Sequence, residues 1–170
     1  TMFQTTSTLC ISSAALEVYS RQSQNVADIN SADYGMEFFG VKVNVTKFDA
    51  DKLEHDSVDW TEGWNGTLTN TFVKLTVSGF STAIEADGVN GNPTLVNFTA
   101  ISTTGGTGIQ IKNNSGATIN GLTLTGFTTK FDFRDSAPTS NLIIDGVNAN
   151  EAGTFASSTV VESDFSWINN

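Results

Sequence analysis

Four copies of one short pattern recur along the chain, spaced 21, 26 and 20 residues apart. Each copy alternates apolar and polar residues and then places a tiny residue before a last apolar one, with one exception at Ile143. The copies begin at Leu75, Val96, Leu122 and Leu142. Strand-like alternation at such intervals is typical of a solenoid, in which each coil contacts only its neighbours.

A second strand is expected after the tiny residue, where alternation resumes in residues 83–87, 108–112 and 130–134. Side chains two apart on a strand share a face, so the apolar ones should point inward. The expected inward rows of these second strands are Ile84, Ile109 and Phe131, and Ala86, Ile111 and Phe133. Those of the first strands are Leu75, Val96, Leu122 and Leu142, and Val77, Phe98, Leu124 and Ile144.

The tiny residues mark an expected corner in each copy, where a bent backbone needs a small side chain. They are Gly79, Ala100, Gly126 and Gly146. Because alanine stands there once, the corner is not expected to require a positive φ. The apolar rows predict that Phe98, Ile109, Leu124 and Phe131 lie buried in one continuous core.

The N-terminal part fits the pattern less regularly. Residues 36–41 match the first-strand template, and residues 58–63 form a degenerate copy. We expect a strand at 15–18, a polar loop or capping turn at 20–33, and a short helix or excursion in the charged segment 47–57.

Small polar residues at 148–158 precede an expected last strand that starts at 159–161. Phe165, Trp167 and Ile168 would then cap the last coil. The expected organisation is one domain over residues 1–170, with irregular N-terminal coils in 14–69, regular coils in 70–150 and a cap in 151–170.

The charge and hydropathy of the chain exclude two classes of binding partner, nucleic acids and the membrane interior. The net charge is −10, from 8 basic and 18 acidic residues, without a basic run, so binding to nucleic acid is excluded. No apolar run approaches the ~18 residues of a membrane helix, and membrane insertion is excluded too.

The single cysteine, Cys10, has no partner for an internal disulfide and is expected to be a small strand residue. No signal peptide is evident. The abundance of Thr, Asn, Ser and Gly is typical of an extracellular, cell-surface or virion protein.

Residues 114–124, Asn-Ser-Gly-Ala-Thr-Ile-Asn-Gly-Leu-Thr-Leu, resemble a coil of the pectate-lyase-like proteins. The resemblance covers residues 70–150 well and 14–69 weakly. It implies an all-β fold, a right-handed parallel β-helix of about five or six coils. That superfamily includes lyases, hydrolases, phage tailspikes, adhesins and passive stalks, so the fold gives little function. Residues 59–64 are also similar to a short segment of surface β-helix proteins of Bacteroidetes, which implies a cell-surface setting.

The β-helix enzymes that the chain resembles use clustered carboxylates with Arg or Lys on outward strand positions, often with calcium. The outward rows expected here are Glu85, Gln110 and Asp132, and Asp87, Lys112 and Arg134. Glu85, Asp87 and Asp132 are therefore the candidate calcium ligands, and calcium is the one cofactor considered. The alternative, which we favour, is a ladder of complementary charges. The one histidine, His55, lies in the charged segment, and no adjacent carboxylate pair with a matched base is evident, so no catalytic residue is assigned.

A neutral outward rank is expected on the first strands, formed by Thr76, Asn97, Thr99, Thr123 and Thr125. Flat threonine ranks can order water, which makes ice binding one hypothesis and carbohydrate contact another. The favoured alternative is an ordinary solvated sheet face.

Trp60 and Trp64 lie four apart in a segment that contains Gly63. Aromatic faces stack on sugar rings, so these two side chains, helped by Glu62 and Asn65, are the candidate glycan-binding residues. The alternative, which we favour, is that both rings fill the edge of the core or cap the end of a coil.

The sequence thus favours a non-enzymatic surface, secreted or virion module for structural display or adhesion, with a carbohydrate or other cell-surface ligand. A polysaccharide lyase or hydrolase is the second hypothesis, and an ice-binding solenoid is the third. Because a solenoid has open ends, self-association into a trimeric fibre or filament is a further hypothesis.

Overall fold

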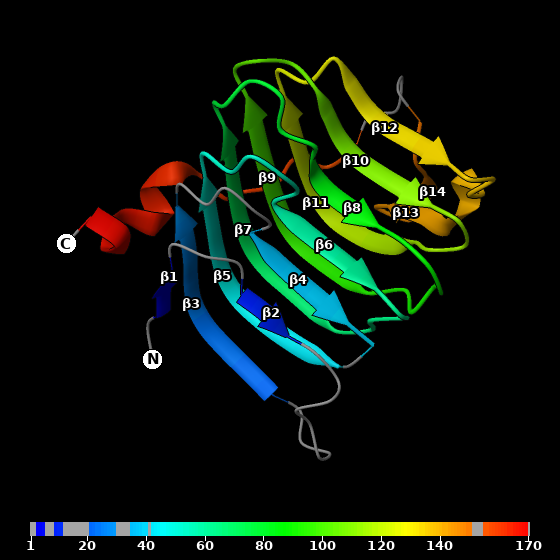
Figure 1. The fold of residues 1–170 in the computed structure, drawn as a ribbon, viewed down its shortest axis with the longest axis horizontal. Helices are drawn as coiled ribbons and strands as arrows, with labels where there is room; N and C mark the ends of the chain where they lie inside the picture. The colour runs from blue at the N-terminus through cyan, green and yellow to red at the C-terminus, as the bar shows by residue number, and fades with distance from the viewer. Residues whose placement is uncertain are drawn as a thin grey trace.

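A computed structural model describes residues 3–5, 9–11, 21–29, 35–40, 42–150 and 155–169 (Figure 1). Its strands form two sheets. The large sheet has the order β1 (Phe3–Thr5), β3 (Arg21–Ile29), β5 (Val43–Asp51), β7 (Thr67–Leu75), β9 (Thr94–Ser102), β11 (Ala117–Thr125), β13 (Leu142–Ile144) and β14 (Val147–Asn148). The small sheet has the order β12 (Thr129–Arg134), β10 (Thr107–Lys112), β8 (Thr82–Ala86), β6 (Val58–Thr61), β4 (Met36–Phe39) and β2 (Leu9–Ile11).

From β1 to β13 the chain alternates between the sheets, so each of these strands pairs with the strand two places on, and among the described strands only β14 pairs with its immediate predecessor. Every pairing is parallel except that of β13 with β14. This is a parallel β-solenoid, as the sequence predicted. Between β4 and β12 the described chain makes about four turns. Cys10 lies in β2, on a strand as expected.

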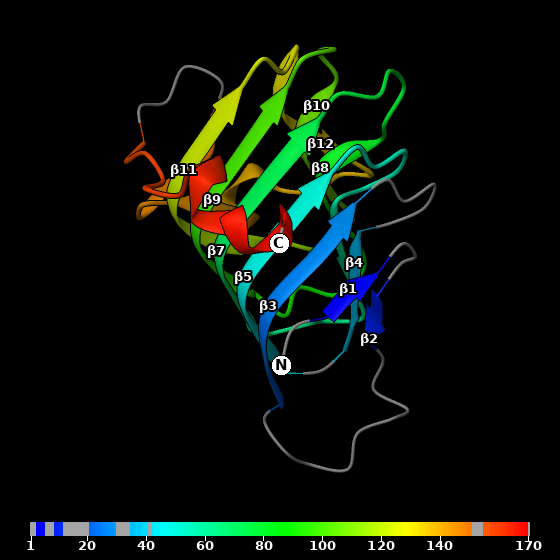
Figure 2. The same cartoon turned by 90° about the vertical axis from the view of Figure 1, so that its left-hand side faces the viewer.

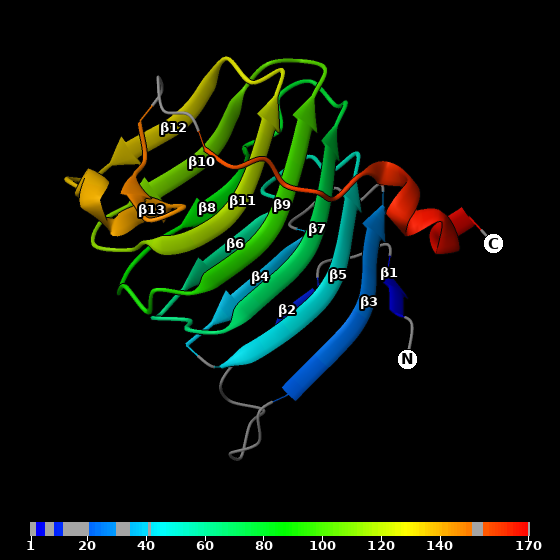
Figure 3. The ribbon, with the colours of Figure 1, turned by 180° about the vertical axis from the view of Figure 1, so that it is seen from behind.

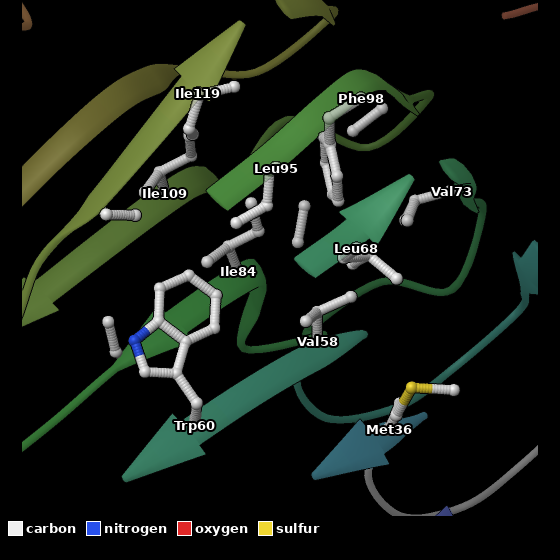
Figure 4. Close-up of a cluster of buried hydrophobic side chains, with 14 of the residues drawn as sticks. Met36, Val58, Trp60, Leu68, Val73, Ile84, Leu95, Phe98, Ile109 and Ile119 are labelled. Atoms are coloured by element: carbon white, nitrogen blue, oxygen red, sulfur yellow. The ribbon is translucent and has the colours of Figure 1, made fainter. Parts of the chain in front are cut away.

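The core lies between the two sheets (Figure 4). In the small sheet the inward rows predicted for residues 84–133 are confirmed, because Ile84 aligns with Ile109 and Ile109 with Phe131. The same rows continue to Met36 and Val58, which are fully buried. Residues 36–39 therefore belong to the small sheet, and their assignment to the first-strand template was wrong.

The long strands of the large sheet bend at one level. Each of β5, β7, β9 and β11 contains one residue with positive φ, namely Lys47 (63°), Asn70 (54°), Asn97 (57°) and Gly121 (76°). Asparagine and glycine tolerate this left-handed conformation best. The amide of Asn97 donates to Oδ1 of Asn70 at 3.2 Å, which links two neighbouring bends. The bend carries each strand around the core (Figure 2).

This bend shifts the phase of the alternation, and the predicted rows of the large sheet were out of register for that reason. In β7, Leu68 points inward before the bend, and Val73 and Leu75 do so after it. Leu75 consequently aligns with Ser102 and not with Val96. The observed inward row is Val45, Leu68, Leu95, Ile119 and Ile144. Phe98, Ile109 and Phe131 are buried as predicted, whereas Leu124 is only partly buried against the core.

The tiny residues do not share one corner. Gly126 follows Thr125, which aligns with Ile101, so its equivalent on β9 is Ser102. Ala100 lies within β9 and is fully buried. Gly79, Gly126 and Gly146 all have positive φ, at 88°, 80° and 80°. The expectation of a common corner without positive φ was therefore wrong.

Several predictions for the flanking segments are also corrected. Residues 21–29, expected as a loop, form β3, and residues 47–51, expected as a helix or excursion, belong to β5. In both cases pairing with a neighbouring coil satisfies the backbone of a polar segment. The strand expected at 15–18 lies outside the described residues.

The C-terminal segment does not form a strand at 159–161. Residues 155–161 run irregularly across the outside of the large sheet and lead into the 3₁₀ segment η3 (Glu162–Asn169), as Figure 3 shows. Phe165 packs on this outer face and not over the last coil, and the side chain of Ile168 is outside the described part. The last coil is covered instead by residues 139–149, namely η2 (Thr139–Asn141), β13 and β14.

Candidate functional site: the outer face of the small sheet

One row of polar side chains crosses the outside of the small sheet in strict register. The pairs are Glu37 with Asp59, Asp59 with Glu85, Glu85 with Gln110, and Gln110 with Asp132. Neighbouring strands lie ~4.8 Å apart, so each carboxyl group has another polar group beside it. We call these five residues the carboxylate row. Figure 1 looks onto the sheet from this side, and β4 to β12 have no described helix or strand drawn across them.

Two cations neutralise part of the carboxylate row. Lys112 Nζ lies 2.7 Å from Glu85 Oε1, and Arg134 Nε lies 2.7 Å from Asp132 Oδ2. Gln110 Nε2 donates to the same oxygen of Asp132 at 2.9 Å. Partial burial lowers the pKa of Lys112, but the hydrogen bond and attraction from Glu85 outweigh it and raise the pKa overall. The cations therefore pair with members of the carboxylate row and do not form the expected ladder with Asp87: Lys112 binds Glu85 on the next strand, and Arg134 binds Asp132 on its own strand.

Asp59 is the exception in the carboxylate row. It is 8% exposed and sits between Glu37 and Glu85. Burial, followed by repulsion from Glu85, Asp56 and Glu37, raises its pKa to about 8, while Lys112 acts in the opposite direction. At neutral pH Asp59 therefore keeps its proton and can donate a hydrogen bond.

The turn before β6 supports this end of the row. Asp56 is buried, and its Oδ1 accepts a hydrogen bond from Thr82 Oγ1 at 2.5 Å. The backbone N–H of Ser57 also donates to the carbonyl of Thr82 at 3.1 Å. His55 lies exposed on the same turn.

The three candidate calcium ligands are not brought together. Glu85 is paired with Lys112, Asp132 with Arg134 and Gln110, and Asp87 Oδ1 accepts from the side chain of Asn113 at 2.6 Å. Among the described residues, no group of three or more His, Cys, Asp or Glu side chains is arranged to hold a metal ion. Gln110 lies between Glu85 and Asp132 in the row, so the three candidates do not form one shared site in the described structure.

The two candidate tryptophans are core residues. Trp64 is fully buried, stacks on Phe38 at 4.0 Å between ring centroids, and donates from Nε1 to the carbonyl of Val43 at 3.3 Å. Trp60 is 1% exposed and lies 5.6 Å from Trp64. Glu62 and Asn65 are exposed at the turn between β6 and β7, but the rings beside them face the core. Neither ring can stack on a sugar in this fold, so the glycan-binding hypothesis is wrong for both rings, and the alternative that they fill the core is confirmed.

The neutral rank on the large sheet is not a flat exposed surface. Thr99 and Thr123 align, but the C-terminal segment covers them, since Thr99 donates to the carbonyl of Val160 and Thr123 accepts from the N–H of Ser158. Asn97 is engaged at the bend, and Thr76 lies beyond the end of β7. Only Thr125 of the five is exposed. The rank therefore offers no ice-binding plane.

Sequence reasoning missed Glu37 and Asp59 as members of the carboxylate row. The signal was present, because Met36 and Phe38 repeat as Val58 and Trp60 after 22 residues, the same spacing as from Ile109 to Phe131. The acidic residue between each apolar pair then falls on the outward row. Assigning residues 36–41 to the first-strand template hid this alignment.

Comparison with known proteins gives one family. A family model described as a pectate-lyase-like beta helix domain matches residues 20–165. Searches of curated proteins and of solved structures return no significant match. Within the described residues, no helix is long and apolar enough to cross a membrane.

Proposed function

The chain belongs to the family of pectate-lyase-like beta helix domains, and we propose that it is a non-enzymatic module that binds a glycan along its carboxylate row. The observation that carries this proposal is the in-register row Glu37, Asp59, Glu85, Gln110 and Asp132 on a sheet face that no described element crosses. The setting we propose is extracellular, on a cell surface or on a virion.

The chemistry of the row suits sugar hydroxyl groups. Ionised Glu85 and Asp132 accept hydrogen bonds, Gln110 both donates and accepts, and protonated Asp59 donates. Successive groups recur at the strand spacing of ~4.8 Å, so a linear polymer laid across the strands meets one group per coil. Such regular, shallow contacts fit display or adhesion with modest affinity.

Charge selects the glycan class. The chain carries a net charge of −10, and the row itself is mostly acidic, so acidic polysaccharides are repelled. Neutral glycans meet no such penalty, and amino sugars are attracted. We therefore propose neutral or amino-sugar polymers as ligands.

The experiment is calorimetric titration of the chain with neutral, amino-sugar and uronic-acid oligosaccharides. We expect binding of the first two classes, and a loss of at least about tenfold in affinity in the Glu85→Gln variant, because one charge-assisted contact is removed. Asp135→Asn is the matched control, since Asp135 is exposed in the turn just beyond β12. Binding that is unchanged in Glu85→Gln, or seen only with uronic acids, would overturn the proposal.

Hydrolysis of a glycan is the second candidate, and the pair Asp59 and Glu85 favours it. A protonated carboxylic acid beside an ionised carboxylate is the combination that glycoside hydrolysis uses. In that case Asp59 would protonate the leaving oxygen. The test is release of reducing ends from neutral polysaccharides, with Asp59→Asn and Glu85→Gln each abolishing it. No release by the wild-type chain would leave the binding module as the only proposal.

A further inference from the structure

Residues 155–169 lie across the outer face of the large sheet like a strap, and we call this segment the strap (Figure 3). It contacts successive coils in order, from β11 to β9 to β7. The contacts are Leu122 N–H to the carbonyl of Ala156 (2.9 Å), Ser158 N–H to Thr123 Oγ1 (3.2 Å), Thr99 Oγ1 to the carbonyl of Val160 (2.8 Å), and Lys74 Nζ to Glu162 Oε1 (2.8 Å). The strap thus ties together coils that otherwise touch only their neighbours.

A small apolar cluster anchors the far end of the strap. Phe165 lies against Phe72 of β7, with ring centroids 6.2 Å apart, and against Trp167, at 6.3 Å. Val160 completes the cluster, which is separate from the main core. Phe72 points outward from the sheet yet is buried, because the strap covers it.

Beside this anchor lies a buried carboxyl group, Asp49 of β5. It points outward in register with Phe72 on one side and Ala27 on the other, and it is 7% exposed. The charged groups that face it are Asp51 on its own strand, Lys74 on β7 and Glu162 on the strap. Burial, then repulsion by Asp51 and Glu162, raises the pKa of Asp49 to about 7, against the attraction of Lys74.

The contact between the strap and the large sheet leaves buried polar atoms unpaired and some space unfilled. Asp51 Oδ1 and Trp167 Nε1 are buried without a hydrogen-bond partner in the described part of the structure. A hollow of ≈ 260 Å³ also remains between strap and sheet, lined by Phe72, Ile101 and Val160 among others. Unsatisfied polar atoms and missing contacts both weaken attachment. The strap therefore has the features of a segment that opens locally before the solenoid unfolds.

We propose that the strap is a pH-sensitive latch, docked on the large sheet while Asp49 is protonated and released as Asp49 ionises. While the strap is docked, ionisation of Asp49 would place a second negative charge near Glu162 and away from water, so it is unfavourable. Released, Asp49 is solvated and titrates near the ordinary value of 3.8. Between these two values the docked state holds one proton more than the open state, so rising pH favours opening. This device lies on the opposite sheet from the carboxylate row and is independent of the proposed glycan binding.

Hydrogen exchange of the strap amides in the full-length chain, corrected for the intrinsic rate at each pH, tests the latch. We expect the opening equilibrium to rise roughly tenfold per pH unit from about pH 5 toward 7 and then to level off. Asp49→Asn should remove this dependence, since the amide is an uncharged isostere of the protonated acid. Asp135→Asn, the exposed control, should behave as the wild type.

A second variant separates a latch from simple fraying. Phe165→Ala removes the apolar anchor without touching the charges, so it should raise opening at every pH while keeping the same slope. Strap exchange that does not depend on pH in the wild type, or a slope that survives in Asp49→Asn, would overturn the latch. Far-UV circular dichroism of each variant checks that the solenoid itself stays folded.

Discussion

Asp59 and Glu85 face outward at the same register of two adjacent parallel strands, and only Glu85 has a cation bound to it. The pair therefore holds one proton at neutral pH, on Asp59. Asp59 is also neutral in the folded chain over a pH range in which it is ionised in the unfolded chain. This difference makes stability depend on pH.

We expect stability to fall as pH rises from about 4 to about 8. The pKa of Asp59 is raised from 3.8 to about 8 in the folded chain, so between these values the folded state binds one proton more than the unfolded state. The free energy of unfolding then decreases with pH, by on the order of a few kcal/mol in all. Urea titrations at pH 5 and pH 8.5 measure this.

The variant Asp59→Asn should lose most of that decrease, because its amide does not titrate. Asp49 acts in the same direction up to about pH 7, so the double variant with Asp49→Asn should have the flattest profile. An Asp59→Asn profile that parallels the wild type would contradict the raised pKa of Asp59.

Trp64 should behave as a core residue and not as a ligand contact. Its ring stacks on Phe38 with an interplanar angle of 8°, and it is fully buried. We expect Trp64→Ala to cost about 3–5 kcal/mol in urea unfolding. Trp64→Phe keeps an aromatic ring and loses mainly the hydrogen bond to Val43, so about 1 kcal/mol is expected. Equal, small costs for both variants would mean that the ring is not packed as described.

Two glycines with the same backbone angle should respond differently to alanine. Gly79 and Gly126 have φ of 88° and 80°. A Cβ on Gly79 meets no atom within 4 Å, whereas on Gly126 it would lie 1.9 Å from the carbonyl oxygen of Ser102. Gly79→Ala should therefore cost about 1 kcal/mol for backbone strain alone. Gly126→Ala should cost about 3 kcal/mol or more, since steric overlap is added. Thermal unfolding of the two variants compares them, and equal melting temperatures would contradict the overlap at Ser102.

The C-terminal half of the small sheet, namely β8, β10 and β12, was predictable from the sequence because these strands are short and unbent. Period 2 holds from Ile84 to Ala86 and again from Ile109 to Ile111, so rows and register follow directly. In the large sheet a left-handed residue such as Asn70 resets the alternation within each strand. The sequence pattern aligned the copy that starts at Leu75, after the bend of β7, with the copy that starts at Val96 and crosses the bend of β9. The two copies therefore differ in which residues face the core.

The strap explains why other features were beyond the sequence. Phe72 is an apolar residue at an outward position of β7. Its burial depends on the strap, a segment distant in the sequence, which packs over it. Likewise, the pKa of Asp59 depends first on its burial and then on nearby charges, and three of these, Glu85, Glu37 and Lys112, lie on three different strands. The local sequence pattern predicts which face of a strand a side chain lies on. It does not predict which distant segment packs over that face.

The bend at Asn97 should reverse the usual order of alanine and glycine in a strand. Alanine is normally the more stable of the two, by about 0.5–1 kcal/mol. At Asn97 φ is 57°, which costs alanine about 1–2 kcal/mol and glycine almost nothing. Both substitutions lose the amide bond to Asn70, so this loss cancels in the comparison. Asn97→Gly should therefore be more stable than Asn97→Ala in urea unfolding, as the glycine at the equivalent bend of β11, Gly121, suggests.

Thr125 provides the control, because it lies exposed at the end of β11 without a positive φ. There the ordinary order should hold, with Thr125→Ala more stable than Thr125→Gly. If alanine were the better residue at both positions, the left-handed bend would not contribute to the stability of the coil. If glycine were better only at Asn97, the left-handed backbone at the bend would be the cause of the reversed order.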